Sequence, residues 1–317
     1  MSYTPSRAVA YGCLALSMSL VGSYVALSKP LALVFPVFLL AWLRFGIGGL
    51  AMLRWLKKPA TEQPLSWQTK KLVFLESFLG NFMFTLCMIT GVSMTSAVSA
   101  GVIMATIPAV IALMSWIFLK ERIGPRIWAA VACGALGIGL LALAKPAHAA
   151  GDGRHAAWLG NLLVFAAVLC EASYAVIGKK LTAVMSPKRI SSIINLWGFA
   201  LMTPLGLYAA VRFDFVRVGT GMWLLLVFYG LAASVWTVWL WMTGLKSVPA
   251  AQAGVFTVML PVSAALVGVV VLGESLTGIQ MIAFAVSLAG ILLATVPQSR
   301  AGRAAAPRAG GIGSRQR

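Results

Sequence analysis

Long apolar windows alternate with short polar connections along the whole chain. Charged residues, prolines and glycines bound the windows, and each is close to the roughly 20 residues that a helix needs to cross the hydrocarbon core of a bilayer. We therefore predict ten spanning helices, at residues 8–27, 36–55, 72–90, 97–119, 127–144, 157–178, 190–210, 222–245, 250–272 and 278–296.

Composition excludes a soluble domain. Of the 317 residues, 60% are hydrophobic and 10% are charged, and the mean hydropathy is +0.92, whereas a soluble domain carries roughly 25% charged residues. The most polar stretches, 57–71 and 297–317, are too short to bury a core of their own. We expect an all-α integral membrane protein with its binding chemistry inside the spans, and a disordered basic cytoplasmic tail at residues 298–317.

The basic residues are distributed unevenly around the spans. With both termini in the cytoplasm, nineteen lysines and arginines fall on the inner side and five on the outer side, and Arg44 remains within a span. This bias is the usual determinant of orientation, so the net charge of +18 indicates membrane topology and not a nucleic-acid site. We expect a multi-pass protein of the cell inner (plasma) membrane with cytoplasmic termini.

The sequence contains no pattern typical of catalysis or metal binding. The four cysteines lie dozens of residues apart in apolar windows, and His148 and His155 share a loop without a nearby cysteine. HExxH, GxSxG and P-loop patterns are absent from the sequence. We therefore expect no enzyme activity, no cofactor, no metal and no direct use of ATP.

The two halves of the chain are related by an internal repeat. A shift of 153 residues aligns Thr90 and Gly91 with Thr243 and Gly244. The same register pairs Ala100-Gly101-Val102 with Ala253-Gly254-Val255, Pro108 with Pro261, Ala112-Leu113 with Ala265-Leu266, Leu119 with Leu272, Glu121 with Glu274, and Gly137-Ile138 with Gly290-Ile291. A shift of 150 pairs Ser23, Tyr24 and Lys29 with Ser173, Tyr174 and Lys179. The repeated unit is therefore five helices.

An odd number of spans makes the second unit enter the membrane from the side opposite to the first. We predict two inverted repeats, residues 7–145 and 156–297, around a central cavity. Inverted repeats are typical of secondary transporters, which hold a substrate near the bilayer midplane and alternate access by rocking one half against the other. A duplication that only builds a stable bundle is the alternative.

The repeated motifs resemble those of a known family. The run Ala100-Gly101-Val102, Pro108 and Phe118-Leu119-Lys120-Glu121-Arg122 resembles the signature of the EamA-type domain of the drug/metabolite transporter superfamily, and the second half repeats it with Val255, Pro261 and Leu272-Gly273-Glu274-Ser275-Leu276. Pro36 and Leu43-Arg44-Phe45 are similar to another element of this family. The seventh span departs from that element, because it has Asn195-Leu196-Trp197 and no arginine.

This resemblance covers residues 7–296. It implies ten helices, cytoplasmic termini and a central cavity lined mainly by spans 1, 3, 4, 6, 8 and 9. It also implies export of amino acids, related metabolites or drugs without ATP, and it does not distinguish among these substrates.

The repeated prolines and glutamates have structural and functional interpretations. Pro108 and Pro261 lie mid-span, where a missing N–H and a ring clash bend a helix and free a carbonyl. They predict a hinge or a cavity wall, or only a packing bend. Glu121 and Glu274 end the signature helices a few residues before the next helices, so we predict that their carboxylates cap free N–H groups there.

Three ionisable side chains lie within the spans: Arg44, Glu171 and, nearer an edge, Glu76. A central charge costs about 2.5–3.5 kcal/mol on insertion scales, so such groups should face a partner or water. At 1.5 Å per residue, Arg44 and Glu171 lie at matching depths of roughly 15 and 12 Å from the cytoplasmic edge. Either they pair, or Arg44 receives a substrate carboxylate, or Glu171 carries protons; Arg44 could also snorkel to the membrane surface.

Polar and aromatic side chains on the expected cavity helices are candidate substrate contacts, and they are Tyr24, Asn81, Thr90, Ser99, Tyr174, Trp236, Thr237, Trp241 and Gln252, together with Arg44 and Glu171. Aromatic side chains could bind apolar solutes in a cavity or form an interfacial belt.

We predict a secondary transporter that exports small metabolites such as amino acids by alternating access. The alternatives are a multidrug or lipophilic-solute exporter and a channel-like facilitator. The expected partners are a small-molecule substrate, the lipid bilayer and, in one hypothesis, protons, while the oligomeric state is left open.

Overall fold

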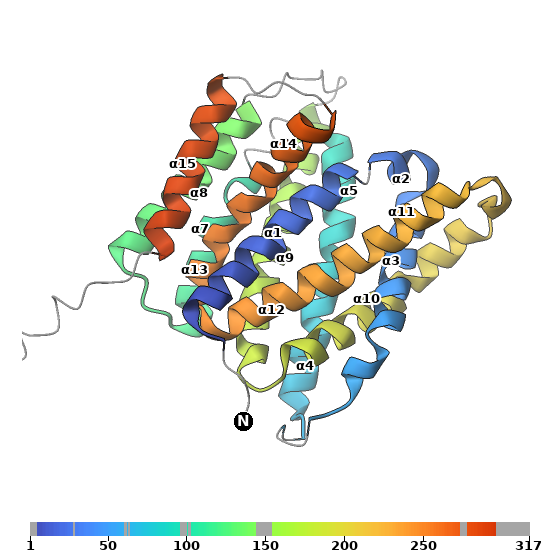
Figure 1. Ribbon diagram of the computed structural model, residues 1–317, viewed down its shortest axis with the longest axis horizontal. Helices are drawn as coiled ribbons and strands as arrows, with labels where there is room; N and C mark the ends of the chain where they lie inside the picture. The colour runs from blue at the N-terminus through green and yellow to red at the C-terminus, as the bar shows by residue number, and fades with distance from the viewer. Residues whose placement is uncertain are drawn as a thin grey trace, which may run out of the picture.

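The computed structural model describes residues 5–27, 29–59, 62, 64–95, 100, 103–143, 154–272 and 278–295. Within these ranges every regular element is helical, and the helices pack into one bundle (Figure 1). The chain is therefore an all-α protein, as its sequence predicts. Ser99, His148, Glu274 and the C-terminal tail lie outside the described residues.

The helices of the first half follow the predicted spans. They are α1 (Arg7–Leu27), α2 (Lys29–Val34), α3 (Val37–Ala51), α4 (Trp67–Ser77), α5 (Phe84–Met94), α7 (Ile107–Met114) and α8 (Pro125–Leu143). Helix α4 begins where the Ser66 side chain accepts a hydrogen bond from the Thr69 N–H (3.2 Å). A π-helical turn, Phe78–Met83, joins α4 to α5, so that one continuous helix forms the third span.

The second half repeats this order. Its helices are α9 (Arg154–Thr182), α10 (Pro187–Ala210), α11 (Thr220–Leu231), α12 (Thr237–Ser247), α13 (Ala250–Gly254), α14 (Met259–Leu272) and α15 (Gly278–Thr295). A π-helical turn, Ala232–Trp236, joins α11 to α12, and a 3-10 turn, Val255–Val258, joins α13 to α14.

The helices have the length and composition of membrane spans. Five stretches in the described part of the chain are long and apolar enough to cross a bilayer, and they are Trp67–Gly91, Trp158–Thr182, Pro187–Ala210, Thr220–Ser247 and Gly278–Thr295. Shorter apolar helices accompany them at Val37–Ala51, Ile107–Leu119 and Pro125–Leu140. The protein is therefore an integral membrane protein, and the total of ten spans stays a prediction.

The two repeated prolines lie near the middle of their predicted spans, where the structure has short irregular turns. Pro108 occupies the first turn of α7, directly after a turn at Ala105 and Thr106. Pro261 is the third residue of α14, directly after the 3-10 turn. A proline cannot donate to the carbonyl four residues earlier, so the irregular segment precedes each proline. Each span is therefore interrupted near its middle, and a hinge at these positions stays a prediction.

The helix packing has the symmetry that the repeat predicts. Helix α8 packs along α15 and α3 along α10, while α1 packs against α12 and α14 in the way that α9 packs against α5 and α7 (Figure 1). At the α8–α15 contact, a Cβ added to Gly290 would lie 2.9 Å from the carbonyl oxygen of Ala130, and one added to Gly137 would lie 2.9 Å from that of Ala283. Both pairs are related by the shift of 153 residues, so the two halves pack through equivalent glycines.

One end of the bundle is closely packed. We call it the α12–α13 end, because α12 ends and α13 begins there, close to the start of α1. Leu14, Leu181, Met242 and Leu245 are fully buried in this region. Ser247 at the end of α12 donates a hydrogen bond to the carbonyl oxygen of Pro5 (3.0 Å). The N-terminal segment and the second half are therefore held together at this end.

Candidate functional site

A cavity of about 500 Å³ lies between the two halves. This volume is within the range of roughly 300–1,000 Å³ that is typical of small-molecule sites. The cavity is lined by Met18, Val21, Tyr24, Arg44, Phe45, Gly80, Asn81, Phe84, Thr85, Met88, Ala100, Met104, Ile107, Ile138, Glu171, Tyr174, Asn195, Ala233, Ser234, Thr237, Val238, Trp241, Thr257 and Leu260. Both halves contribute polar and apolar groups to this lining.

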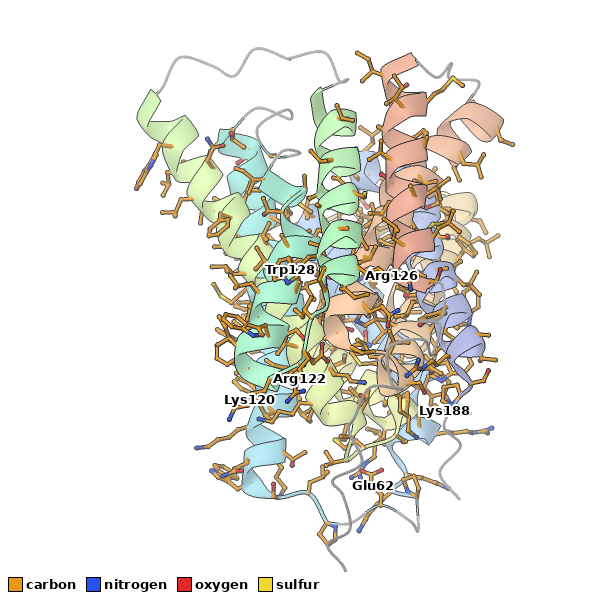
Figure 2. The ribbon with its side chains drawn as sticks, turned by 90° about the vertical axis from the view of Figure 1, so that its left-hand side faces the viewer. Glu62, Lys120, Arg122, Arg126, Trp128 and Lys188 are labelled. Atoms are coloured by element: carbon orange, nitrogen blue, oxygen red, sulfur yellow. The ribbon has the colours of Figure 1, made fainter. Side chains whose placement is uncertain are left out.

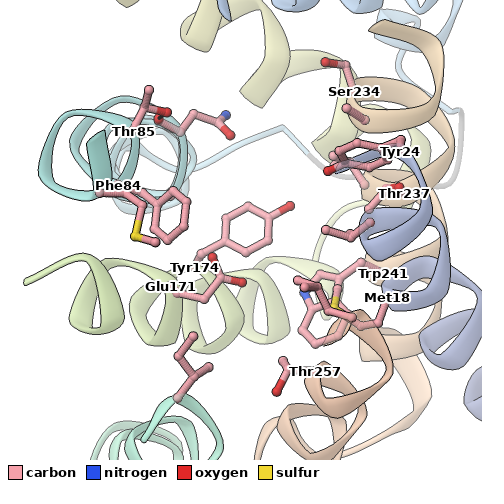
Figure 3. Close-up of a pocket in the computed structure, with 18 of the residues that line it drawn as sticks. Met18, Tyr24, Phe84, Thr85, Glu171, Tyr174, Ser234, Thr237, Trp241 and Thr257 are labelled. Atoms are coloured by element: carbon pink, nitrogen blue, oxygen red, sulfur yellow. Dashed lines mark hydrogen bonds between the residues drawn. The ribbon is translucent and has the colours of Figure 1, made fainter. Parts of the chain in front are cut away.

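Most of the predicted contact residues lie in this cavity. Seven of them line it, namely Tyr24, Arg44, Asn81, Glu171, Tyr174, Thr237 and Trp241. In Figure 3, Glu171 and Tyr174 project from α9 between Phe84 on one side and Trp241 on the other. Trp241 is 2% exposed, so it belongs to the cavity wall and not to an interfacial belt.

Three other predicted residues lie elsewhere. Thr90 is exposed on α5, and Trp236 is 41% exposed, with its ring edge-on to Phe228. Gln252 on α13 donates hydrogen bonds to the Tyr11 hydroxyl (2.9 Å) and to the carbonyl oxygen of Ala294. These three side chains do not line the cavity. The sequence could not exclude them, because hydropathy alone does not distinguish the faces of a uniformly apolar helix.

Four polar groups of the cavity wall have no hydrogen-bond partner among the residues that the structure describes. They are Arg44 Nε, Asn195 Oδ1, Thr237 Oγ1 and Trp241 Nε1. Buried polar groups are normally satisfied, so unpartnered ones beside a cavity are available to a ligand or to water. The set offers two N–H donors, one carbonyl acceptor and one hydroxyl, which suits a polar solute.

The two cavity charges do not pair with each other. Ion pairs within the described ranges join Arg189 to Glu62 and Arg217 to Asp214. The guanidinium of Arg44 lies instead over the ring of Phe45, with Cζ 4.4 Å from the ring centroid. The hypothesis of a structural Arg44–Glu171 pair is therefore wrong for this conformation. Snorkelling is also wrong, because Arg44 Nε is buried at the cavity.

The two π-helical turns occupy equivalent places in the repeats, and both border the cavity. The shift of 153 residues relates Gly80 and Asn81 in the first turn to Ala233 and Ser234 in the second, and all four residues line the cavity. Each turn is held to the other half of the chain: the Asn81 side chain donates to the Ile194 carbonyl (3.2 Å), and Ser234 donates to the Arg44 carbonyl (3.3 Å). Such turns are frequent at functional sites.

The sequence interpretation missed Asn195 and Ser234. The Asn195 amide donates to the carbonyl oxygens of Ser191 (2.8 Å) and Ser234 (3.0 Å), which fixes its orientation and leaves Oδ1 free. The repeat contained a signal for Ser234, because the 153-residue register pairs it with the predicted Asn81. Asn195 was noted only as a departure from the family motif, and no sequence signal indicates that its span reaches the cavity.

Glu121 caps a helix, although not the one predicted. Its carboxylate accepts hydrogen bonds from the N–H groups of Ala250 (2.9 Å) and Ala251 (3.2 Å) at the start of α13, and from the Ser115 hydroxyl. The next helix in the chain, α8, was the expected partner. Because α13 belongs to the second half, this glutamate joins the two halves at the α12–α13 end.

Comparisons with known proteins agree with this architecture. The family model of the EamA-like transporter family matches residues 9–143 and 158–296. The chain is 32% identical over 297 residues to the uncharacterized transporter YetK of Bacillus subtilis, covering 92% of this chain and 88% of that one. It is 26% identical to the uncharacterized transporter YwfM of the same organism, covering 79% and 81% of the two chains. A crystal structure with 22% identity superposes with a TM-score of 0.74 over 92% of this chain and 97% of that one.

Proposed function

We propose that this chain, which belongs to the EamA-like transporter family, is a secondary transporter that exports small metabolites by alternating access. Amino acids or related compounds are the proposed substrates. The two five-helix repeats, residues 7–145 and 156–297, are the proposed moving units. Substrate binds between them, and access alternates as one repeat rocks against the other.

The observation that carries this proposal is the cavity with separate charges of both signs. Arg44 and Glu171 both line it, and neither forms an ion pair with another described residue. A guanidinium is suited to a carboxylate, and a carboxylate is suited to an ammonium group. A zwitterionic solute would satisfy both groups, whereas a purely apolar solute would leave both charges without a partner.

Orientation follows from the basic residues. Figure 2 places Lys120, Arg122 and Lys188 near the same end of the bundle as Glu62. Since short cytoplasmic connections carry an excess of lysine and arginine, we assign the α12–α13 end to the cytoplasm and place the protein in the cell inner membrane. The closely packed end then faces the cytoplasm, so this conformation is closed on the inner side.

A lipophilic-solute exporter is the second candidate, because Tyr24, Tyr174, Phe84 and Trp241 give the cavity a large aromatic surface. Aromatic rings contribute affinity for apolar solutes by burial and stacking. A channel-like facilitator differs from both, because its flux would not saturate.

Counterflow in proteoliposomes tests the proposal. Labelled amino acids should accumulate against an excess of the same unlabelled amino acid inside, with saturation, and Arg44→Ala should abolish accumulation of the carboxylate-bearing solutes. Thr90→Ala is the matched control, because Thr90 is polar and lies on a cavity span but faces outward. Saturable counterflow of lipophilic cations without amino-acid transport would favour the second candidate, and unsaturable flux would favour a channel.

A further inference from the structure

Glu76 is a buried acid that the substrate cavity does not use. It lies in α4, its side chain is 0% exposed, and it does not line the cavity. Neither Oε1 nor Oε2 has a hydrogen-bond partner in the described part of the chain. A carboxylate without a donor is costly in such a place, whereas a neutral carboxylic acid is tolerated far more readily.

On the side of α9 and α12, the carboxyl group of Glu76 borders apolar atoms, while the Tyr174 phenol interacts with it electrostatically. Gly178 of α9 provides the space for it, since a Cβ added there would lie 2.8 Å from Glu76 Oε1. The same position lies 3.1 Å from Met242 Cε and 3.3 Å from Leu245 Cδ1 of α12. The Glu76 niche, which we define by Gly178, Met242 and Leu245, is therefore formed by the two helices that close the α12–α13 end.

Several charged groups on the neighbouring helices contact other parts of the chain. On α9, the Lys179 ammonium donates to the carbonyl oxygen of Leu245 (2.7 Å), and Glu171 and Tyr174 line the cavity. On α10, Arg189 pairs with Glu62 (2.5 Å), and Lys188 is exposed and lies over the rings of Trp55 and Trp239. On α9 and α12, the remaining basic groups are Lys180, which is exposed, and Lys246, which is half-buried at the helix end.

The niche lies close to the substrate cavity. Gly80 follows Glu76 by four residues, about 6 Å along a helix, and Gly80 lines the cavity. A Cβ on Gly80 would also collide with the ring of Tyr174, so the π-helical turn that continues α4 touches α9 directly between the niche and the cavity. A movement at this contact would connect the carboxyl group with cavity water.

We propose that Glu76 is the proton-binding site that couples export to proton entry, and that it is separate from the substrate site. This inference rests on the proposed function. With the α12–α13 end closed, the Glu76 carboxylate takes one proton from water on the outer side. When α12 moves away from α9, Met242 and Leu245 leave the niche, water enters, and the proton passes to cytoplasmic water as the carboxylate forms. One proton thus moves inward for each substrate that moves outward.

Two measurements on purified wild-type protein and Glu76→Gln test this assignment. Infrared spectroscopy at neutral pH reports protonated carboxyl groups without any substrate. The wild-type spectrum should contain a carbonyl-stretch band that Glu76→Gln lacks and that Glu171→Gln retains. In proteoliposomes, Glu76→Gln should keep counterflow within about twofold of the wild type and lose all stimulation by a pH gradient, because glutamine preserves shape but cannot exchange a proton.

Several results would overturn the assignment. Identical infrared spectra would show that Glu76 holds no proton, and pH-driven flux surviving in Glu76→Gln would show that coupling lies elsewhere. Loss of coupling in Glu171→Gln alone would transfer the role to Glu171. If Glu76→Gln folds poorly, Gly178→Ala provides a second variant, which keeps the acid but crowds it and should shift the pH dependence of flux. Absence of counterflow in the wild type would refute the proposed function, while the infrared result would still decide protonation of Glu76.

Discussion

Glu121→Ala should loosen the α12–α13 end. The substitution removes the acceptor of two N–H groups, those of the buried residues Ala250 (0% exposed) and Ala251 (2% exposed). Loss of an N-terminal cap costs about 0.5–2 kcal/mol, and loss of a negative charge at a helix start costs about 0.3–1 kcal/mol. Because the contact joins the two halves, we expect roughly 1–3 kcal/mol to be lost from the closed conformation. That free energy corresponds to about a 5- to 150-fold increase in the open-to-closed ratio.

Thiol accessibility measures this ratio. The four native cysteines are free thiols and would be replaced first. A reporter, Leu14→Cys, would then be introduced at a fully buried position of α1. In inside-out vesicles, a membrane-impermeant thiol reagent should label this cysteine faster in Glu121→Ala, by the factor given above. Glu121→Gln should be intermediate, because its amide oxygen can still accept hydrogen bonds but carries no charge.

The matched control is Arg122→Ala, which removes an exposed neighbouring charge that takes no part in the cap. It should leave the labelling rate unchanged. An unchanged rate in Glu121→Ala, with normal amounts of folded protein, would refute the reasoning, because it would show that the contact does not distinguish the two conformations. An equal rise in Arg122→Ala would attribute the effect to surface charge.

Three further predictions concern separate parts of the chain. Arg44→Gln should raise the half-saturating concentration of carboxylate-bearing solutes in counterflow by about 10- to 150-fold, because a charge-assisted hydrogen bond is worth about 1.5–3 kcal/mol, and should change that of neutral solutes little. Lys120→Gly should raise the free energy of unfolding by about 0.5–1 kcal/mol, because Lys120 has φ of 54° and glycine adopts that region without steric cost. A destabilised variant would show that contacts of the lysine side chain contribute more than the backbone strain costs. Gly137→Val should cost at least about 1–3 kcal/mol through overpacking against Ala283, whereas Gly12→Val, with open space around its Cβ position, should be tolerated.

The sequence predicted the helices well because membrane spans have a strong signal. Wherever the structure describes its residues, an apolar window corresponds to a helix or to helices joined by a short irregular turn. The signal is strong because lipid offers no hydrogen bonds, so an apolar segment of this length must satisfy its own backbone. The repeat predicted the equivalent α8–α15 glycines and the equivalent cavity positions, because a duplicated sequence packs in the same way twice.

The sequence could not predict contacts between distant helices. Glu121 was expected to cap the helix that follows it, but its partner, α13, is 129 residues away. The π-helical turns also lacked a signal, since glycine, alanine and serine occur throughout the spans. Arg44 and Glu171 were placed at the right depth by counting residues, but depth does not specify the direction in which a side chain points, and direction decided that they line one cavity without pairing.

The distribution of charge between the repeats leads to a final prediction about coupling. A shift of 150 residues pairs Tyr24 with Tyr174, but it pairs Glu171 with Val21. The acid therefore belongs to the second repeat alone, and Arg44 belongs to the first. Since the repeats move against each other in the proposed cycle, the distance between the two charges changes, and only a solute that contacts both of them is affected by the change.

A ligand shifts an equilibrium only by its difference in affinity for the two states. A zwitterion should therefore alter the labelling rate of Leu14→Cys, whereas the same molecule without its amino group should bind through Arg44 and leave that rate unchanged. Equal effects of the two solutes would show that one charge suffices to drive the conformational change.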